Sequence, residues 1–369
     1  MTKKKNAKPP KFKDMVGPQV VEELARVIHQ FYKPFKAQEF IVRGTAPPFA
    51  TLELKARIGH LAEVLSDFLP SDYSKAARIL VQAAPIARGF NNWVLCFYVE
   101  KFGLEHFDDS VAAMKELTKH GSAELAIRPY MIRYTRQMLS VVMDWTGDPN
   151  EHVRRLAAEG TRPRGVWMPH VEAFKKDPQP VIQILEQLKA DPSLYVRKAV
   201  ANNLNDISKD NPELFLKTAR KWQKGAGEDT SWIIKRAART LIKQGHPEAM
   251  ALFGFGGKAQ IKNVKLTASP AKVSIGESTQ LTLDLKSAAK SSQKLAIDYR
   301  VHYVKASGKT SAKIFKWTER ELGEGEKLQL TKKHSFAEQS TRKHYPGEHL
   351  VEVTINGEVW GITDVVLSP

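Results

Sequence analysis

Three segments in the middle of the chain share one pattern, and this pattern constrains the fold more than any other sequence feature. Each segment opens with an aspartate, has an apolar residue five positions later, and continues with two cations; the aspartates are Asp148, Asp191 and Asp229. The starts lie 43 and 38 residues apart (148 to 191, 191 to 229). Repeats of this length are typical of stacked helix pairs, so the sequence predicts a helical solenoid of the HEAT type.

The two adjacent cations occupy the same place in every repeat. They are Arg154 and Arg155, Arg197 and Lys198, and Lys235 and Arg236. Stacked repeats would stack these cations into a ladder of positive charge. The whole chain carries a formal net charge of +17, which favours an anionic partner such as nucleic acid. We therefore predict a surface that binds a polyanion.

Length and composition restrict the class of protein. A chain of 369 residues is long enough for two domains with separate cores. The single cysteine, Cys96, lies in an apolar run and is predicted to be buried. One cysteine excludes a disulfide within the chain and suits a reducing cytosol, so we expect a cytoplasmic protein. The sequence shows neither a signal peptide nor an apolar run of membrane-spanning length.

Apolar residues at three- and four-residue spacing predict helices in the first two thirds of the chain. They are expected from Val20 onward and over residues 52–68, 73–84, 93–102, 110–120 and 131–145. Ser122 is predicted to cap a short helix that carries Glu124. Asp148 and Asp191 are predicted near helix N-termini, with the next proline in the first turn. Proline and glycine predict a loop over residues 161–167.

Beyond residue 257 the pattern changes from helical to alternating. Apolar and polar residues alternate in several runs, and Asn356-Gly357 between two runs is typical of a tight hairpin. Seven or eight short strands predict an antiparallel sandwich. The predicted fold class is therefore mainly α, a HEAT-like solenoid followed by an all-β sandwich. Residues 1–14 are predicted as a disordered basic arm, 15–257 as the helical domain and 258–369 as the sandwich.

Helical spacing also places polar residues beside the repeated cations. Residues four apart share a helix face, so Arg155 should neighbour Glu159, Lys198 should neighbour Asn202 and then Asp206, and Arg236 should neighbour Thr240. Such a polar column suits a solvent-facing groove, although a plain surface ion pair between Arg155 and Glu159 gives the same spacing.

Two further residues are open to two readings each. Glu124 is either a candidate site carboxylate or an acid favoured by the helix dipole. Trp167 either anchors its loop or stacks on a nucleotide.

Other kinds of site find no support in the sequence. The eleven histidines show no metal-ligand spacing. The glycine-rich run at residues 253–257 lacks the Lys-Ser/Thr of a phosphate loop, and no serine lies in a nucleophile elbow. We therefore expect no metal and no cofactor, and carboxylate chemistry is what the residues suggest.

In its sequence motifs the chain resembles the AlkC branch of the AlkC/AlkD DNA alkylation-repair glycosylases. The resemblance covers nearly the whole length and includes residues 12–16, 52–57, 90–93, 122–130, 154–167, 200–210, 232–235 and 239–241. Its most specific part is the block Ala-Asn-Asn-Leu-Asn-Asp-Ile-Ser at residues 201–208, which generic HEAT repeats lack. The C-terminal strands resemble the immunoglobulin-like domain that many AlkC members carry.

The resemblance implies a monofunctional DNA glycosylase that releases cationic N3-alkylated bases, such as 3-methyladenine and 3-methylcytosine, without base flipping. It implies Glu124, Glu159 and Asp206 as the acidic site residues and Trp167 beside the lesion. Arg155, Arg162 and Lys198 would contact the DNA backbone. The expected set of DNA-binding cations is completed by Arg154, Arg164, Arg197, Lys235, Arg236 and Arg239.

The expected partner is double-stranded DNA with alkylated bases, bound by a monomer that associates with the nucleoid. The alternative that the residues leave open is a non-catalytic HEAT scaffold that binds nucleic acid or acidic proteins.

Overall fold

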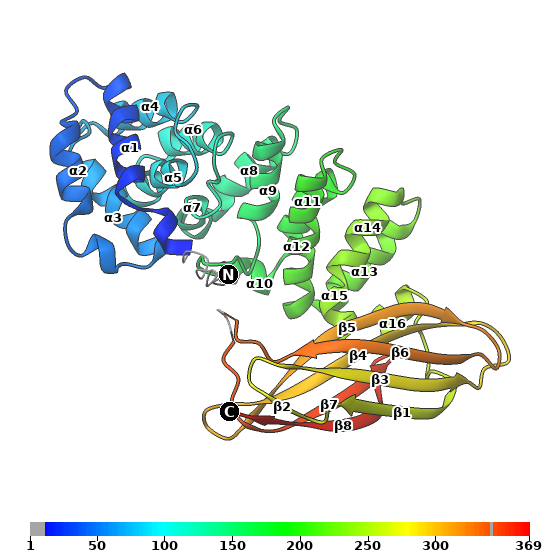
Figure 1. Cartoon of the computed structure of the whole chain (residues 1–369). Coiled ribbons are helices and arrows are strands. Elements are labelled where there is room, and N and C mark those ends of the chain that lie inside the picture. Colours follow the sequence, from blue (N-terminus) through cyan, green and yellow to red (C-terminus); the bar gives the residue numbers. More distant parts are fainter. Residues whose placement is uncertain (1–11, 340–341) are drawn as a thin grey trace. The chain divides into compact units, whose positions relative to one another are not determined.

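The structure, a computed structural model, describes residues 12–339 and 342–369, and it changes from helix to strand between Leu252 and Ile261 (Figure 1). This confirms the predicted order of a helical part and an all-β part. The helices up to the repeats are η1 (Phe12–Met15), α1 (Pro18–Phe31), α2 (Ala37–Thr45), η2 (Phe49–Thr51), α3 (Leu54–Ser66), α4 (Tyr73–Ala83), α5 (Phe90–Phe102), α6 (Phe107–Leu117) and α7 (Ile127–Arg133).

The later helices are α8 (Thr135–Trp145), α9 (Glu151–Gly160), α10 (Glu172–Lys176), α11 (Gln179–Leu188), α12 (Leu194–Asp210), α13 (Pro212–Gln223), α14 (Glu228–Ala237), α15 (Arg239–Lys243) and α16 (Pro247–Leu252). The strands are β1 (Ile261–Ser269), β2 (Lys272–Ser274), β3 (Ser278–Ser287), β4 (Gln293–Val304), β5 (Thr310–Leu322), β6 (Lys327–Ser335), β7 (Gly347–Ile355) and β8 (Glu358–Ser368).

The chain forms two compact units whose boundary falls inside the last helices. The first unit contains residues 1–211 and 225–233, and the second contains residues 212–224 and 234–369. The predicted division at residues 257 and 258 into a functional helical domain and a sandwich stays a prediction. Of the predicted arm, residues 1–11 lie outside the described residues, whereas Phe12 to Asp14 belong to η1.

The first unit is built around amphipathic helices. Helix α1 begins at Pro18, where a missing N–H group has no consequence, and it buries Val21, Leu24 and Ile28 at the expected spacing. Helix α5 packs against α3 and is buried over most of its surface, including Cys96, which is 1 % exposed. Burial raises the pKa of the Cys96 thiol to about 12, as befits a core residue.

The repeats form as predicted, but their helices start later than expected. Helix α9 is capped by Asn150, whose side chain accepts from the N–H of His152, and α12 is capped in the same way by Ser193. Asp148 and Asp191 lie two residues before these caps and accept the cap residue's own N–H, each at 2.8 Å. The prolines therefore precede the helices, because the Asp-Pro pair forms the turn into the helix.

Three further local predictions were wrong. Ser122 caps no helix; Glu124 lies in a turn before α7, and the hydroxyl of Ser122 accepts from Arg155 instead. The helix expected over residues 131–145 is interrupted at Tyr134, which separates α7 from α8. The helical continuity assumed between Arg236 and Thr240 is also broken, because Ala238 separates α14 from α15.

The strands of the second unit form two sheets with the orders β1-β3-β6 and β2-β8-β7-β4-β5. Alternate residues such as Leu281, Leu283 and Leu285 point into a shared apolar core. Asn356 and Gly357 connect β7 to β8 with φ angles of 49° and 83°, as the hairpin signal predicted. A Cβ atom at Gly357 would lie 2.6 Å from the Cα of Gly245, so a larger residue cannot fit there.

No helix among the described residues is long and apolar enough to cross a membrane.

Candidate functional site

The three predicted carboxylates lie in one chain of alternating charges within the first unit. Arg155 Nη2 is 2.5 Å from Glu124 Oε2 and 3.6 Å from Glu159 Oε2. Arg162 then donates to Glu159 Oε1 at 2.5 Å and to Asp206 Oδ2 at 2.7 Å. The order is therefore Glu124, Arg155, Glu159, Arg162, Asp206, and it joins α9, α12 and the turn before α7. The convergence of the three acids, which spacing alone left open, is a feature of the structure.

The two arginines are fixed by burial and by their acidic partners. The side chains of Arg155 and Arg162 are only 14 % and 10 % exposed. Burial alone lowers the pKa of Arg155, but Glu124 and Glu159 outweigh it and the pKa is raised overall. The same balance holds for Arg162, with Glu159 and Asp206 as the opposing acids. Both guanidiniums therefore keep their charge and hold the carboxylates in place.

The three carboxylates differ in how far their oxygens are already engaged. Glu159 contacts both arginines, and Asp206 is shared between Arg162 and Lys209, whose Nζ lies 2.8 Å from Oδ1. Among the described residues Glu124 pairs with Arg155 alone, through Oε2, which is buried at that contact. The Glu124 side chain is 21 % exposed, against 8 % for Glu159 and 3 % for Asp206. Glu124 is the acid most able to accept a further donor.

The block at residues 201–208 explains why α9 and α12 hold this register. Asn203 is fully buried, and its amide donates to the carbonyl of Ala158 at 2.8 Å and to the hydroxyl of Thr161 at 3.1 Å. Glu159 lies between these two acceptors, so Asn203 fixes the end of α9 against α12. Asp206 follows Asn203 by three residues on the same helix and thereby faces Arg162.

A buried arginine, Arg128, holds the loop between α9 and α10 in place. Arg128 is fully buried and donates to the carbonyls of Gly160, Arg162 and Pro169, so it ties both ends of the loop together. Burial and the nearby Arg162 lower the pKa of Arg128 to about 10, which leaves it charged at neutral pH. Arg128 therefore sets the position of Arg162 within the chain of alternating charges.

The tip of this loop presents Trp167 to solvent. Trp167 is 59 % exposed and has a φ of 62°, a left-handed conformation that costs a bulky residue about 1–2 kcal/mol. A Cβ atom at Gly165 would lie 2.1 Å from the sulfur of Met168, so a larger residue there would require the Met168 side chain to move. Lys55 of α3 donates to the Trp167 carbonyl at 3.0 Å. One contact from a distant position, the hydrogen bond from Lys55, thus reaches the strained tip.

In the first two repeats, the first cation of the pair joins neighbouring repeats. Arg154 donates to both oxygens of Asp191, at 2.6 Å and 3.0 Å, and to the carbonyls of Asp148 and Pro149. Arg197 repeats the arrangement one step along, with the carbonyls of Asp191 and Pro192 and with Asp229 at 3.0 Å. At these positions, the cations of the predicted ladder are therefore engaged in ion pairs.

The remaining predicted cations have varied surroundings. Lys198 is exposed and makes no ion pair with the described residues. Arg164 pairs with Asp210 at 2.5 Å and holds the pKa of that carboxyl below its usual value. In the second unit, Lys235 pairs with Glu319 at 2.5 Å, and Arg239 donates to the carbonyl of Arg236.

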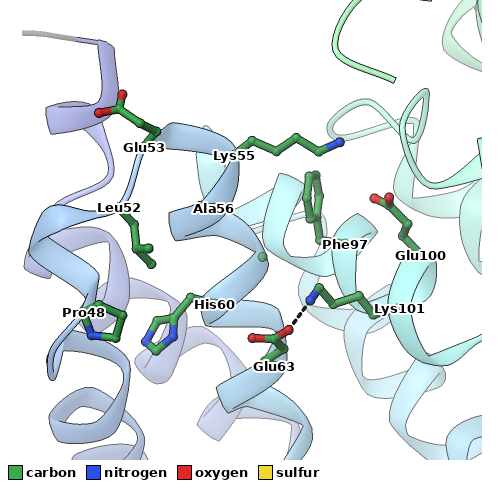
Figure 2. Close-up of a pocket in the computed structure, with 11 residues that line it drawn as sticks. Pro48, Leu52, Glu53, Lys55, Ala56, His60, Glu63, Phe97, Glu100 and Lys101 are labelled. Atoms are coloured by element: carbon green, nitrogen blue, oxygen red, sulfur yellow. Dashed lines mark hydrogen bonds and ion pairs between the residues drawn. The ribbon is translucent and has the colours of Figure 1, made fainter. Parts of the chain in front are cut away.

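A separate open cavity of about 700 Å³ lies between α3 and α5 (Figure 2). Its lining includes Lys55, His60, Phe97 and Glu100, and Figure 2 shows Phe97 between Lys55 and the ion pair of Glu63 with Lys101. Burial raises the pKa of Glu100, although Lys55 and Lys101 act in the opposite direction. The described residues contain no cluster of acids, histidines or cysteine that could hold a metal ion.

Sequence reasoning missed Arg128 and Lys55. Arg128 had a usable signal, because a single cation in the apolar run from Leu125 to Met131 must find buried acceptors. Lys55 had none, because its acceptor lies 112 residues away.

Comparison with known proteins agrees with the two-part organisation. Residues 100–241 match the family model "DNA alkylation repair enzyme", and residues 262–369 match "Uncharacterised protein YhaZ, C-terminal Ig-like domain". The uncharacterized protein YhaZ of Bacillus subtilis is 39 % identical over 347 residues, which cover 94 % of this chain and 96 % of that protein.

A solved structure matches over the full length. The alkylpurine DNA glycosylase AlkC of Pseudomonas fluorescens, bound to DNA containing an abasic site analog, is 38 % identical. The match has a TM-score of 0.92 and covers 98 % of this chain and 100 % of that one.

Proposed function

Because the chain belongs to the AlkC family of DNA alkylation repair enzymes, we propose that it is a monofunctional DNA glycosylase. Its proposed substrates are cationic N3-alkylated bases in duplex DNA, 3-methyladenine and 3-methylcytosine, which it removes without base flipping. The observation that carries this proposal is the chain of alternating charges from Glu124 to Asp206, since it concentrates three fixed carboxylates on one region of a cationic protein.

The chemistry of the substrate matches these carboxylates. An N3-alkylated base already bears a positive charge, so it leaves without a strong general acid, and the sugar develops oxocarbenium character. A carboxylate about 4 Å from that sugar contributes roughly 4 kcal/mol of attraction at an effective dielectric near 20. Because arginines already hold the acids in place, no reorganisation is needed as the charge develops.

Within this scheme we propose different roles for the three acids. Glu124 pairs with one arginine and is the most exposed of the three acids, so it positions the attacking water. Glu159 and Asp206 are saturated by cations and supply a fixed negative field. Trp167 contacts the lesion from its exposed loop.

We also propose a division among the cations. Arg155 and Arg162 orient the carboxylates and reach the DNA backbone from that position. Lys198, exposed and without an ion pair among the described residues, is the clearest phosphate contact in the first unit. Arg164, Lys235, Arg236 and Arg239 complete the proposed DNA-binding set. Arg154 and Arg197 belong to the scaffold in this proposal, because their guanidiniums are occupied between repeats.

The test is release of free base from methylated duplex DNA. Wild type should release 3-methyladenine without cutting the strand, and Glu124→Gln should slow release by a factor of about 10²–10³, the loss expected when a residue that positions the attacking water is removed. Glu159→Gln and Asp206→Asn should slow release and also lower stability, since each leaves a buried arginine with fewer acids. The control is Glu172→Gln, which removes an exposed acid paired with Lys175 and should change neither property.

Tight DNA binding by the wild type with no base release would contradict the glycosylase proposal. That result would instead favour the alternative of a non-catalytic scaffold.

A further inference from the structure

The structure assigns to Lys55 the role of a positioning residue that presents Trp167. The inference rests on the proposed function only in that Trp167 is taken to meet the lesion. Lys55 lies on α3, more than a hundred residues from the loop, and its ammonium donates to the main-chain carbonyl of Trp167 at 3.0 Å. No other side chain among the described residues donates to the tip of this loop at Val166 or Trp167.

The loop needs this contact because its ends are held firmly and its tip is not. Its ends are fixed by Arg128, which is fully buried and bonds three carbonyls. Its tip is exposed, and Trp167 has a left-handed backbone that a bulky side chain keeps only when neighbours enforce it. The buried side chain of Met168 packs against Gly165. Lys55 supplies the restraint on Trp167 itself.

Lys55 is suited to this role because it is itself held by a rigid surface. Its ammonium lies 5.8 Å from the centre of the Phe97 ring, and Phe97 is buried on α5, the most enclosed helix of the unit. Glu100, one turn further along α5, draws the ammonium toward the same place. Figure 2 shows Lys55 extended across the rim of the cavity above Phe97. Lys55 therefore fixes the loop tip relative to α3 and α5.

A readout without DNA tests the placement directly. The chain has seven tryptophans, so fluorine NMR of protein labelled with 5-fluorotryptophan gives one signal for Trp167, which Trp167→Phe identifies by its loss. Lys55→Met should shift or broaden that signal, and Lys55→Arg should restore it. Lys101→Met is the matched control, because Lys101 lines the same cavity but pairs with Glu63. A Trp167 signal that is unchanged in Lys55→Met would overturn the inference, whatever the protein does to DNA.

A second readout asks whether the placement serves catalysis. With methylated duplex in single turnover, Lys55→Met should release base about fivefold to tenfold more slowly, the loss expected for one exposed hydrogen bond from a charged donor. Lys55→Arg should recover most of the rate. In a Trp167→Ala background Lys55→Met should have no further effect, because the lysine acts through the indole.

The two proposals fail in different ways. If the wild type releases no base, the glycosylase proposal fails while the fluorine result still decides the role of Lys55. If Lys55 instead contacts a phosphate, the rate losses of the Lys55 and Trp167 variants will add. The slope of log affinity against log salt for DNA binding will then also fall by about 0.9 in Lys55→Met. Additive effects with that change in slope would overturn the positioning role.

Discussion

Replacing Arg154 by alanine should destabilise the helical unit far more than replacing Arg197, although the two residues occupy the same repeat position. Arg154 makes four hydrogen bonds, and two of them go to Asp191, whose side chain is 3 % exposed. Arg154→Ala leaves that carboxylate buried, with the N–H of Ser193 as its remaining donor among the described residues. Breaking one partner of a buried ion pair costs about 3–5 kcal/mol.

Arg197 makes the equivalent contacts one repeat along, but to a more exposed acid. It bonds two carbonyls, but its acid, Asp229, is 54 % exposed. Two neutral-acceptor bonds at about 1 kcal/mol each, plus an exposed ion pair worth little, give about 2 kcal/mol for Arg197→Ala. With a shift of about 2–4 °C per kcal/mol for a unit of this size, Arg154→Ala should lower Tm by about 6–20 °C and Arg197→Ala by about 4–8 °C.

The assay is thermal unfolding of the full chain followed by far-ultraviolet circular dichroism. Arg133→Ala, which removes an exposed ion pair with Glu105, is the control and should leave Tm unchanged. The salt dependence of DNA binding, measured below the unfolding range, should keep its slope in Arg154→Ala. Equal shifts for Arg154→Ala and Arg197→Ala, or a slope reduced by about 0.9 in Arg154→Ala, would refute the assignment of Arg154 to the scaffold.

Two further outcomes are expected. Lys198→Gln should reduce the slope of log affinity against log salt by about 0.9 while melting stays unchanged, and an unaltered slope would exclude a phosphate contact. Burial, with Arg342 nearby, lowers the pKa of His334 to about 4, from an unfolded value near 6.5, so the folded state prefers neutral His334. The stability that comes from keeping His334 neutral should therefore be fully present above pH 6.5 and should be lost as the pH drops toward 4. His334→Gln should weaken that dependence in pH-dependent melting, and an unchanged profile would contradict it.

The repeats were predictable from sequence because each carries its own signal. An aspartate before a helix, an apolar core position and a cation follow one another within eight residues, and Asn356-Gly357 marks its hairpin in the same local way. Local chemistry also explains the errors there. Asn150 and Ser193, rather than the aspartates, cap the helices because they lie one residue before the first helical position.

The direction in which neighbouring side chains point was not predictable. Arg154 and Arg155 are adjacent in sequence, but successive helix positions differ by about 100°, so one reaches the next repeat and the other reaches the carboxylates. Spacing identified Arg155 with Glu159 correctly, since both lie on one helix. The link from Arg162 to Asp206 spans 44 residues and depends on how two helices pack.

The hydrogen bond from Lys55 to the Trp167 loop limits how far the chain can be shortened. The stretch that matches the DNA alkylation repair model, residues 100–241, includes all three site acids, both bridging arginines and Arg128. It leaves out Lys55 and Phe97. A fragment trimmed to that stretch would retain the charge pattern yet lose the support of the loop tip, so minimal versions of this protein have to begin before α3.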